Sequence, residues 1–140
     1  MNVHACLEVD ARHQRVLVTF RIENRGERRV WLPRAIAADT RLRGRLFDLR
    51  AFPGDAPVGY IGAAAASATG SAAPGPDNYL ELAPHSAHTH TIDITGCYAF
   101  AAGEHTYQIR YAGQVMGDIR HPEVMTDLST DAVMFRHTAP

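Results

Sequence analysis

Hydrophobic and polar residues alternate along much of the chain with a period of two, which is the pattern of a half-buried β-strand. The clearest case is segment 15–23, whose alternate apolar positions are Val16, Val18, Phe20 and Ile22. Similar alternation predicts strands at 3–9, 29–33, 47–52, 79–82, 88–94, 107–111 and 131–137. The first of these is expected to lie at a sheet edge.

Turn residues separate the expected strands and set the fold class. Segment 24–27 is expected to form a hairpin turn in which Gly26 has a positive φ, and Pro33 is expected to end a strand. The single tryptophan, Trp31, is expected in the core between two sheets. Regular short strands without a convincing helix predict an all-β fold, an immunoglobulin-like antiparallel β-sandwich of seven to nine strands.

Three segments do not follow the alternating pattern. Residues 35–38 fit either a short helical turn or a crossover, and Arg41, Arg43 and Arg45 would share one solvated face of an edge strand. Residues 113–126 are expected to be a connector. Ala, Ser, Gly and Pro dominate segment 63–78, so we expect a mobile loop there.

The length of 140 residues predicts one domain over 1–140, with a long loop at about 53–78. The net charge is −1, so no basic field favours nucleic acid, and no apolar run reaches bilayer-spanning length. All 14 basic residues are Arg. The absence of Lys has two open explanations, codon bias and function.

The N-terminus has neither a basic nor an apolar region of the kind found in signal peptides. The chain is therefore expected in the cytoplasm if this N-terminus is native, and outside it if a signal peptide was removed. Cys6 and Cys97 are expected to be buried, reduced thiols in the first case, whereas an exported sandwich could join them in a disulfide.

His85, His88 and His90 are the best candidates for metal ligands. His88 and His90 lie two residues apart, so both imidazoles would project from the same side of a strand. A complete site needs three or four ligands, and the spacing defines only two. Surface histidines without a metal are therefore the preferred interpretation, and no cofactor is expected.

Two hydrophobic side chains, Tyr60 and Ile61, lie between Gly59 and Gly62. Such a loop could present them as anchors for a protein partner. Packing in the core is the competing interpretation.

No motif for catalysis is present. The chain lacks the Gly-x-Ser-x-Gly motif of a serine nucleophile. Either cysteine could be a nucleophile only with a placed base, and the local sequence supplies none in a known catalytic pattern. The chain also lacks the His-Glu-x-x-His pair of zinc peptidases. We therefore expect a protein that is not an enzyme.

The order of several motifs resembles a known family. They are VTFRIENRG at 18–26, LFDL at 46–49, VGYIG at 58–62, NYLELAPHS at 78–86, IDI at 92–94, CYAF at 97–100, and Gly103 with the strand 107–111. This order is similar to the immunoglobulin-like N-terminal domain that precedes the catalytic domain in deuterolysin-type peptidyl-Lys metalloendopeptidases. His85 stands where that family has a glycine, and the catalytic domain is absent.

The resemblance implies a domain that binds a protein partner, such as a deuterolysin-like metallopeptidase, as an inhibitor, an immunity-like protector or a folding partner. Two other functions stay open. One is a metal-binding or enzymatic protein that uses His85, His88 and His90. The other is a structural module that joins a larger assembly through an exposed strand edge.

Overall fold

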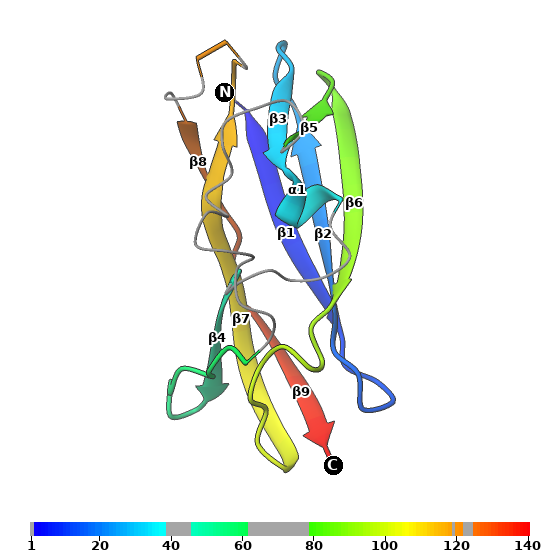
Figure 1. The fold of residues 1–140 in the computed structure, drawn as a ribbon, viewed down its shortest axis with the longest axis vertical. Coiled ribbons are helices and arrows are strands. Elements are labelled where there is room, and N and C mark those ends of the chain that lie inside the picture. The colour runs from blue at the N-terminus through cyan, green and yellow to red at the C-terminus, as the bar shows by residue number, and fades with distance from the viewer. Residues whose placement is uncertain (1, 39–45, 62–78, 119, 122–124) are drawn as a thin grey trace.

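The computed structural model describes residues 2–38, 46–61, 79–118, 120–121 and 125–140, and it is built from two antiparallel sheets (Figure 1). The smaller sheet contains, in order, β1 (Val3–Asp10), β2 (Leu17–Asn24) and β6 (Ser86–Asp93). The larger sheet contains β4 (Phe47–Phe52), β7 (Gly103–Met116), β3 (Val30–Pro33) and β5 (Tyr79–Leu82), and β8 (Met125–Ser129) and β9 (Val133–Ala139) also pair with β7. The predicted all-β sandwich is confirmed.

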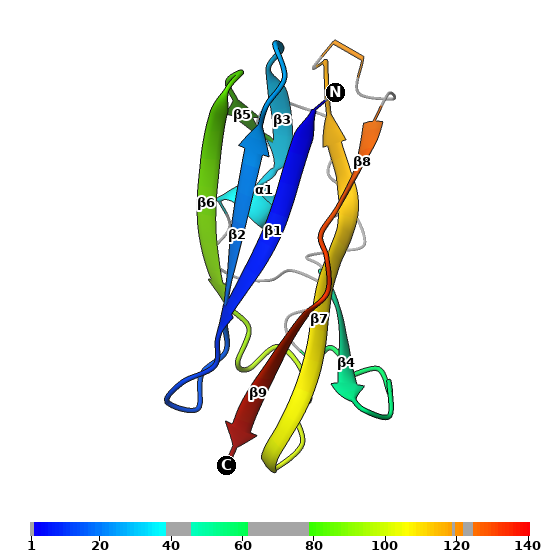
Figure 2. The ribbon, with the colours of Figure 1, turned by 180° about the vertical axis from the view of Figure 1, so that it is seen from behind.

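The long strand β7 is the centre of the larger sheet. Its first half pairs with β4 on one side and β9 on the other. Its second half pairs with β8 over Ala112–Met116 and with β3 at Met116. Along each side of β7, two shorter strands therefore follow one another (Figure 2). The helical turn α1 (Arg34–Ala37) follows β3, at the position where a short helical turn or a crossover was expected.

The core lies between the sheets and follows the alternation of the strands. On β2, Val18, Phe20 and Ile22 are completely buried, and on β7 the inward residues are Tyr107, Ile109 and Tyr111. The ring of Phe20 stacks on Phe47 of β4 at 5.5 Å between centroids, so aromatic contacts connect the two sheets.

A tyrosine closes the corner that leads into β7. The Tyr107 hydroxyl accepts a hydrogen bond of 3.2 Å from the backbone N–H of Ala101, six residues upstream. Gly103, with φ of 89°, lies between them. A tyrosine near the start of this strand, bonded back to the preceding corner, is a feature of immunoglobulin-like sandwiches.

Two predictions about the first half of the chain are wrong. Segment 24–27 is not a hairpin turn, because β2 and β3 belong to different sheets, and Gly103 rather than Gly26 is the described glycine with positive φ. Trp31 is half-buried on the side of β3 opposite to the buried Val30 and Leu32. A strand of four residues has two faces, and the smaller side chains occupy the inner one.

The expected connector at 113–126 is also wrong in part. β7 continues to Met116, and β8 starts at Met125 and pairs with it. The arginines at 41, 43 and 45 and the loop at 63–78 lie outside the described residues. The solvated face expected for these arginines and the mobile loop expected at 63–78 therefore remain predictions.

His137 is a buried titratable residue at the far end of β9. Its side chain is 3% exposed, its ring lies 4.8 Å from that of Phe100, and no described residue offers its Nδ1 a hydrogen bond. Burial lowers the pKa of this imidazole below its usual value. The folded chain therefore holds His137 neutral.

The expected result is a fold that loses stability on acidification. Between the lowered pKa of the folded state and the value of about 6.5 in the unfolded state, the unfolded chain binds more protons, so the free energy of unfolding should fall as pH drops below about 6.5. Urea unfolding at several pH values should show this slope, and His137→Leu should reduce it. The control His13→Asn, in an exposed turn, should keep it, and an unchanged slope in His137→Leu would contradict the assignment.

Candidate functional site

Residues 56–61 form a segment that is fixed to the larger sheet and to the corner before β7. The Val58 N–H donates to the Leu49 carbonyl of β4 at 2.8 Å, and the Ile61 N–H donates to the Cys97 carbonyl at 2.8 Å. A segment with backbone hydrogen bonds at both ends holds its side chains in a defined orientation. It is therefore a preorganised surface rather than a loose loop.

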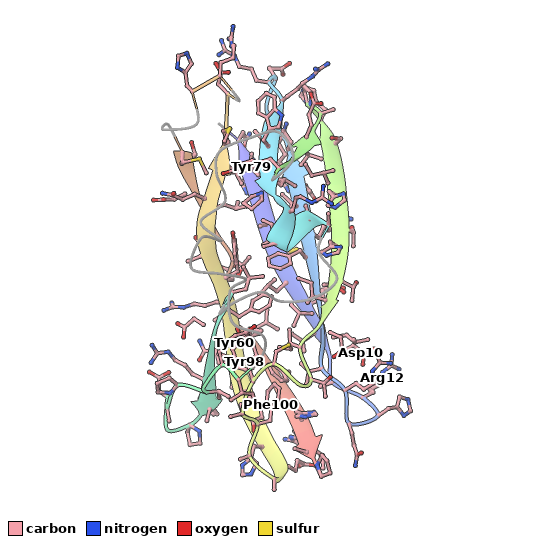
Figure 3. The ribbon with its side chains drawn as sticks, in the orientation of Figure 1. Asp10, Arg12, Tyr60, Tyr79, Tyr98 and Phe100 are labelled. Atoms are coloured by element: carbon pink, nitrogen blue, oxygen red, sulfur yellow. The ribbon has the colours of Figure 1, made fainter. Side chains whose placement is uncertain are left out.

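The structure separates the two apolar residues of this segment. Tyr60 is half-buried, and its ring meets that of Tyr98 edge to face at 5.5 Å between centroids (Figure 3). Burial raises the pKa of Tyr60, so its hydroxyl stays protonated. Ile61 is 64% exposed, so core packing accounts for part of Tyr60 and not for Ile61. Gly59 is exposed, and Gly62 lies outside the described residues.

Tyr98 packs against this segment from the side of the core. It is 2% exposed, and its hydroxyl accepts from the Phe47 N–H at 3.0 Å and lies 3.3 Å from the Phe47 carbonyl, to which it can donate. These two bonds connect the corner to the start of β4. Tyr60 and Ile61 are therefore placed by contacts that reach into the core.

A second exposed apolar group lies on the outer face of β4, β7 and β9. Phe52 and Met134 are each 50% exposed, and both belong to the outward set of their strands. Phe52 pairs with Thr106, and Met134 pairs with Gln108, so the two side chains lie on either side of β7. We call the surface formed by the outward residues the Phe52–Met134 surface, and its members are Asp48, Arg50, Phe52, Thr106, Gln108, Arg110, Met134 and Arg136.

Charged groups on this surface are joined in a network. Asp48 accepts from Arg50 Nε and from Arg110 Nε, each at 3.0 Å. Burial acts to raise the pKa of Asp48, but the bonds from Arg110 and Arg50 outweigh it and the pKa is lowered. The surface is thus an outer sheet face with apolar side chains beside guanidinium groups that Asp48 holds.

The three candidate metal ligands do not converge. His85 is exposed and lies 3.1 Å from a carboxylate oxygen of Glu27. His88 and His90 lie on the inner side of β6 and are half-buried, with ring centroids 6.5 Å apart, and His88 Nε2 is 2.6 Å from the Ala37 carbonyl. Their expected surface position is corrected to a half-buried one, because α1 packs against this side of β6.

Across the described residues, no three histidine, cysteine, aspartate or glutamate side chains lie close enough together to hold a metal ion. The two cysteines are free thiols. Cys6 is exposed on β1, which corrects its expected burial, and Cys97 is half-buried. Burial raises the pKa of the Cys97 thiol, which disfavours the nucleophilic thiolate form.

A cleft of about 640 Å³ lies at the end of the molecule opposite to segment 56–61, and it was not predicted from the sequence. The segment after β2, the residues after the end of β7 and the start of β8 form its walls, with Asn24, Arg28, Asp118 and Thr126 among the lining residues. Asp118 is bonded to Arg120, and Asn24 is bonded to the backbone, so these two groups are already engaged.

The Phe52–Met134 surface was also missed. The sequence contains a signal for it. Phe52, Asp48 and Arg50 occupy alternate positions of one strand, so Phe52 lies on the same face as two polar residues and points away from the core. Met134 shares its parity with Arg136 for the same reason.

No helix in the described part of the chain has the length and apolar character needed to cross a bilayer. Comparison with known proteins adds no family to these observations: no protein-family model matches the chain, and no curated protein matches it.

Proposed function

We propose that this chain is a non-enzymatic protein-binding domain whose partner contacts the Phe52–Met134 surface and the segment 59–61. One observation carries the proposal. The large hydrophobic side chains that are strongly exposed among the described residues are Phe52, Ile61 and Met134, at 50%, 64% and 50%. Phe52 belongs to β4, Met134 to β9 and Ile61 to the segment that is hydrogen-bonded to β4, and β4 and β9 lie at the same end of the molecule (Figure 1).

The composition of this surface suits a protein partner. Phenylalanine, methionine and arginine are enriched at protein interfaces, where apolar anchors are surrounded by polar groups. Phe52 and Met134 supply the anchors, and Arg50 and Arg110 are held in place by Asp48. Little ordering of the backbone is needed on binding, because the anchors sit on strands or on a hydrogen-bonded segment.

The partner class that we propose is a deuterolysin-like metallopeptidase, bound as an inhibitor, an immunity-like protector or a folding partner. Two features support it. The order of motifs resembles the N-terminal domain of such enzymes, and the chain has no Lys, the residue beside which these peptidases cleave. A protein without that residue would resist its own partner.

Phe52→Ala and Met134→Ala should each lower affinity for the partner about tenfold or more, because each removes an apolar anchor of about 1.4 kcal/mol or more. The binding assay is calorimetry against a metallopeptidase encoded beside this chain. Both side chains are half-exposed, so the variants should stay folded, as circular dichroism would show. The control Cys6→Ala alters an exposed residue of the other sheet and should bind normally.

Two outcomes would contradict different parts of the proposal. Failure of every neighbouring metallopeptidase to bind would remove the partner class. Binding that is unchanged in Phe52→Ala, Ile61→Ala and Met134→Ala would remove the surface.

A further inference from the structure

The smaller sheet ends at β6, and one side of this strand pairs with nothing in the described part of the chain. β6 forms a regular ladder with β2 over eight residues, from Leu17 opposite Asp93 to Asn24 opposite Ser86. The order β1-β2-β6 leaves the other side of β6 as the edge of the sheet. In both ribbon views no described element lies beyond that edge (Figures 1 and 2).

The hydrogen bonds at the end of the ladder show which backbone groups face outward. The Ile94 N–H donates to the Val16 carbonyl at 2.9 Å, so the even-numbered residues of β6 are the ones that bond to β2. In an antiparallel pair these positions alternate with positions whose N–H and C=O point to the other side. The outward groups of β6 therefore belong to Ala87, Thr89, Thr91 and Asp93.

This edge lacks the features that usually prevent pairing. Free edges are commonly blunted by Lys, Pro, bulges or a covering segment. β6 contains no Pro, Lys or Arg, and its register has no bulge. The other edges differ: β8 and β9 approach β1, the Val58 N–H bonds to the Leu49 carbonyl of β4, and β5 has only four residues.

We propose that β6 pairs antiparallel with β6 of a second copy of this chain, with Thr89 on the two-fold axis. Thr89 then lies opposite Thr89 of the other copy, and Ala87 lies opposite Thr91 in both directions. Asp93 lies opposite His85 of the other copy, so no like charges oppose each other, and threonine pairs are favourable on a sheet surface. The strand is thus complementary to itself in this register, and the dimer has one continuous sheet of six strands.

The inner side of β6 is compatible with this arrangement. His88 points inward and its Nε2 lies 2.6 Å from the Ala37 carbonyl of α1. The helical turn therefore packs on the inner face, and the outward backbone groups are not used by it. The β6 edge and the Phe52–Met134 surface belong to different sheets, so this inference stands independently of the proposed function.

Association should be weak, because a single strand pair offers a small contact, and interfaces below roughly 1,200 Å² are usually transient. Sedimentation velocity from micromolar to millimolar concentration should show a monomer that converts to a dimer. Thr89→Pro removes an outward N–H that β2 does not use, and Thr89→Lys places charge at the axis, so both variants should remain folded monomers. Thr138→Lys on β9 is the matched control and should dimerise normally.

A disulfide can test the register directly. Residues in a hydrogen-bonded antiparallel pair have Cα atoms about 5.5 Å apart, within the range that a disulfide spans. In a Cys6→Ser background, Thr89→Cys should give a covalent dimer under mild oxidation, and Thr138→Cys should not. A wild-type chain that stays monomeric at millimolar concentration, or a dimer that both Thr89 variants leave intact, would overturn the proposal.

Discussion

Replacement of Asn24 by alanine should destabilise the fold by about 3 kcal/mol, because buried hydrogen-bonding groups left without partners cost about 1–3 kcal/mol each. Asn24 is 1% exposed. Its Nδ2 lies 2.8 Å from the Arg28 carbonyl and 3.2 Å from those of Leu82 and Ala83, and its Oδ1 accepts from the Gly26 N–H at 3.0 Å. One amide therefore joins the end of β2 to the turn before β3 and to the end of β5.

Asn24→Asp separates the contribution of the Nδ2 donor from that of the Oδ1 acceptor. A carboxylate keeps the bond from the Gly26 N–H but has no donor for the three carbonyl oxygens. At pH 7 this variant should therefore be at least as unstable as the alanine variant. Burial and the nearby carbonyl oxygens should raise the pKa of the new carboxyl in the folded state above about 3.9.

The pH dependence of Asn24→Asp follows from that shift. The folded state would bind the proton more tightly than the unfolded state. The difference in the free energy of unfolding between this variant and the wild type should therefore shrink as pH falls toward 4. Urea unfolding of both chains at pH 5 and pH 7 measures this difference. Asn2→Ala, at an exposed residue, is the control, and a loss in Asn24→Ala of less than about 0.5 kcal/mol would contradict the role of Asn24.

The role of Asn24 could not be predicted from the local sequence. Asn-Arg-Gly after a strand is typical of a turn, and the chain bends at 26–28. Whether the turn joins neighbouring strands of one sheet depends on partners far away in sequence, such as the Leu82 carbonyl. The same local pattern therefore fits a hairpin and a passage between sheets.

The strands themselves could be predicted because their burial has a local signature. Along β2, Val18, Phe20 and Ile22 are completely buried while the alternate residues are half-buried or exposed. This period of two is fixed by strand geometry, whichever partner the strand finds. The sequence therefore predicts the fold class and the inward face of β2 without knowledge of the strand order.

The second half of β7 and the candidate surface depend on pairing instead. Ala112, Gly113 and Gln114 have little intrinsic preference for strands, and β8 stabilises them by pairing. Exposure of Ile61 likewise depends on the hydrogen bond that its N–H makes to the Cys97 carbonyl. Sequence patterns single out the residues 59–61, but the contacts that hold them come from the corner at 97–99.

Gly113→Ala should be as damaging as the loss of Asn24, with an expected destabilisation of about 3 kcal/mol, the upper part of the range for overpacked cores. A Cβ atom at this position would lie 2.0 Å from the Tyr111 Oη and 2.5 Å from its Cζ. The Tyr111 ring lies across the glycine, is 4% exposed, and packs edge to face on Phe20 at 5.2 Å. Burial raises the pKa of Tyr111 to about 12, so its neutral phenol occupies this space across the ordinary pH range.

A double-mutant cycle would show whether the clash with Tyr111 is the cause. Tyr111→Leu shortens the side chain that covers the glycine, so Gly113→Ala should cost clearly less in that background than in the wild type. Gly96→Ala is the matched control, because no atom lies within 4 Å of its added Cβ, and it should change stability by less than about 0.5 kcal/mol. Equal losses for Gly113→Ala in both backgrounds would mean that the glycine is needed for its backbone and not for the room it leaves to Tyr111. The pairing of β7 with β8, which starts beside this residue, would then be limited by backbone conformation rather than by the packing of the core.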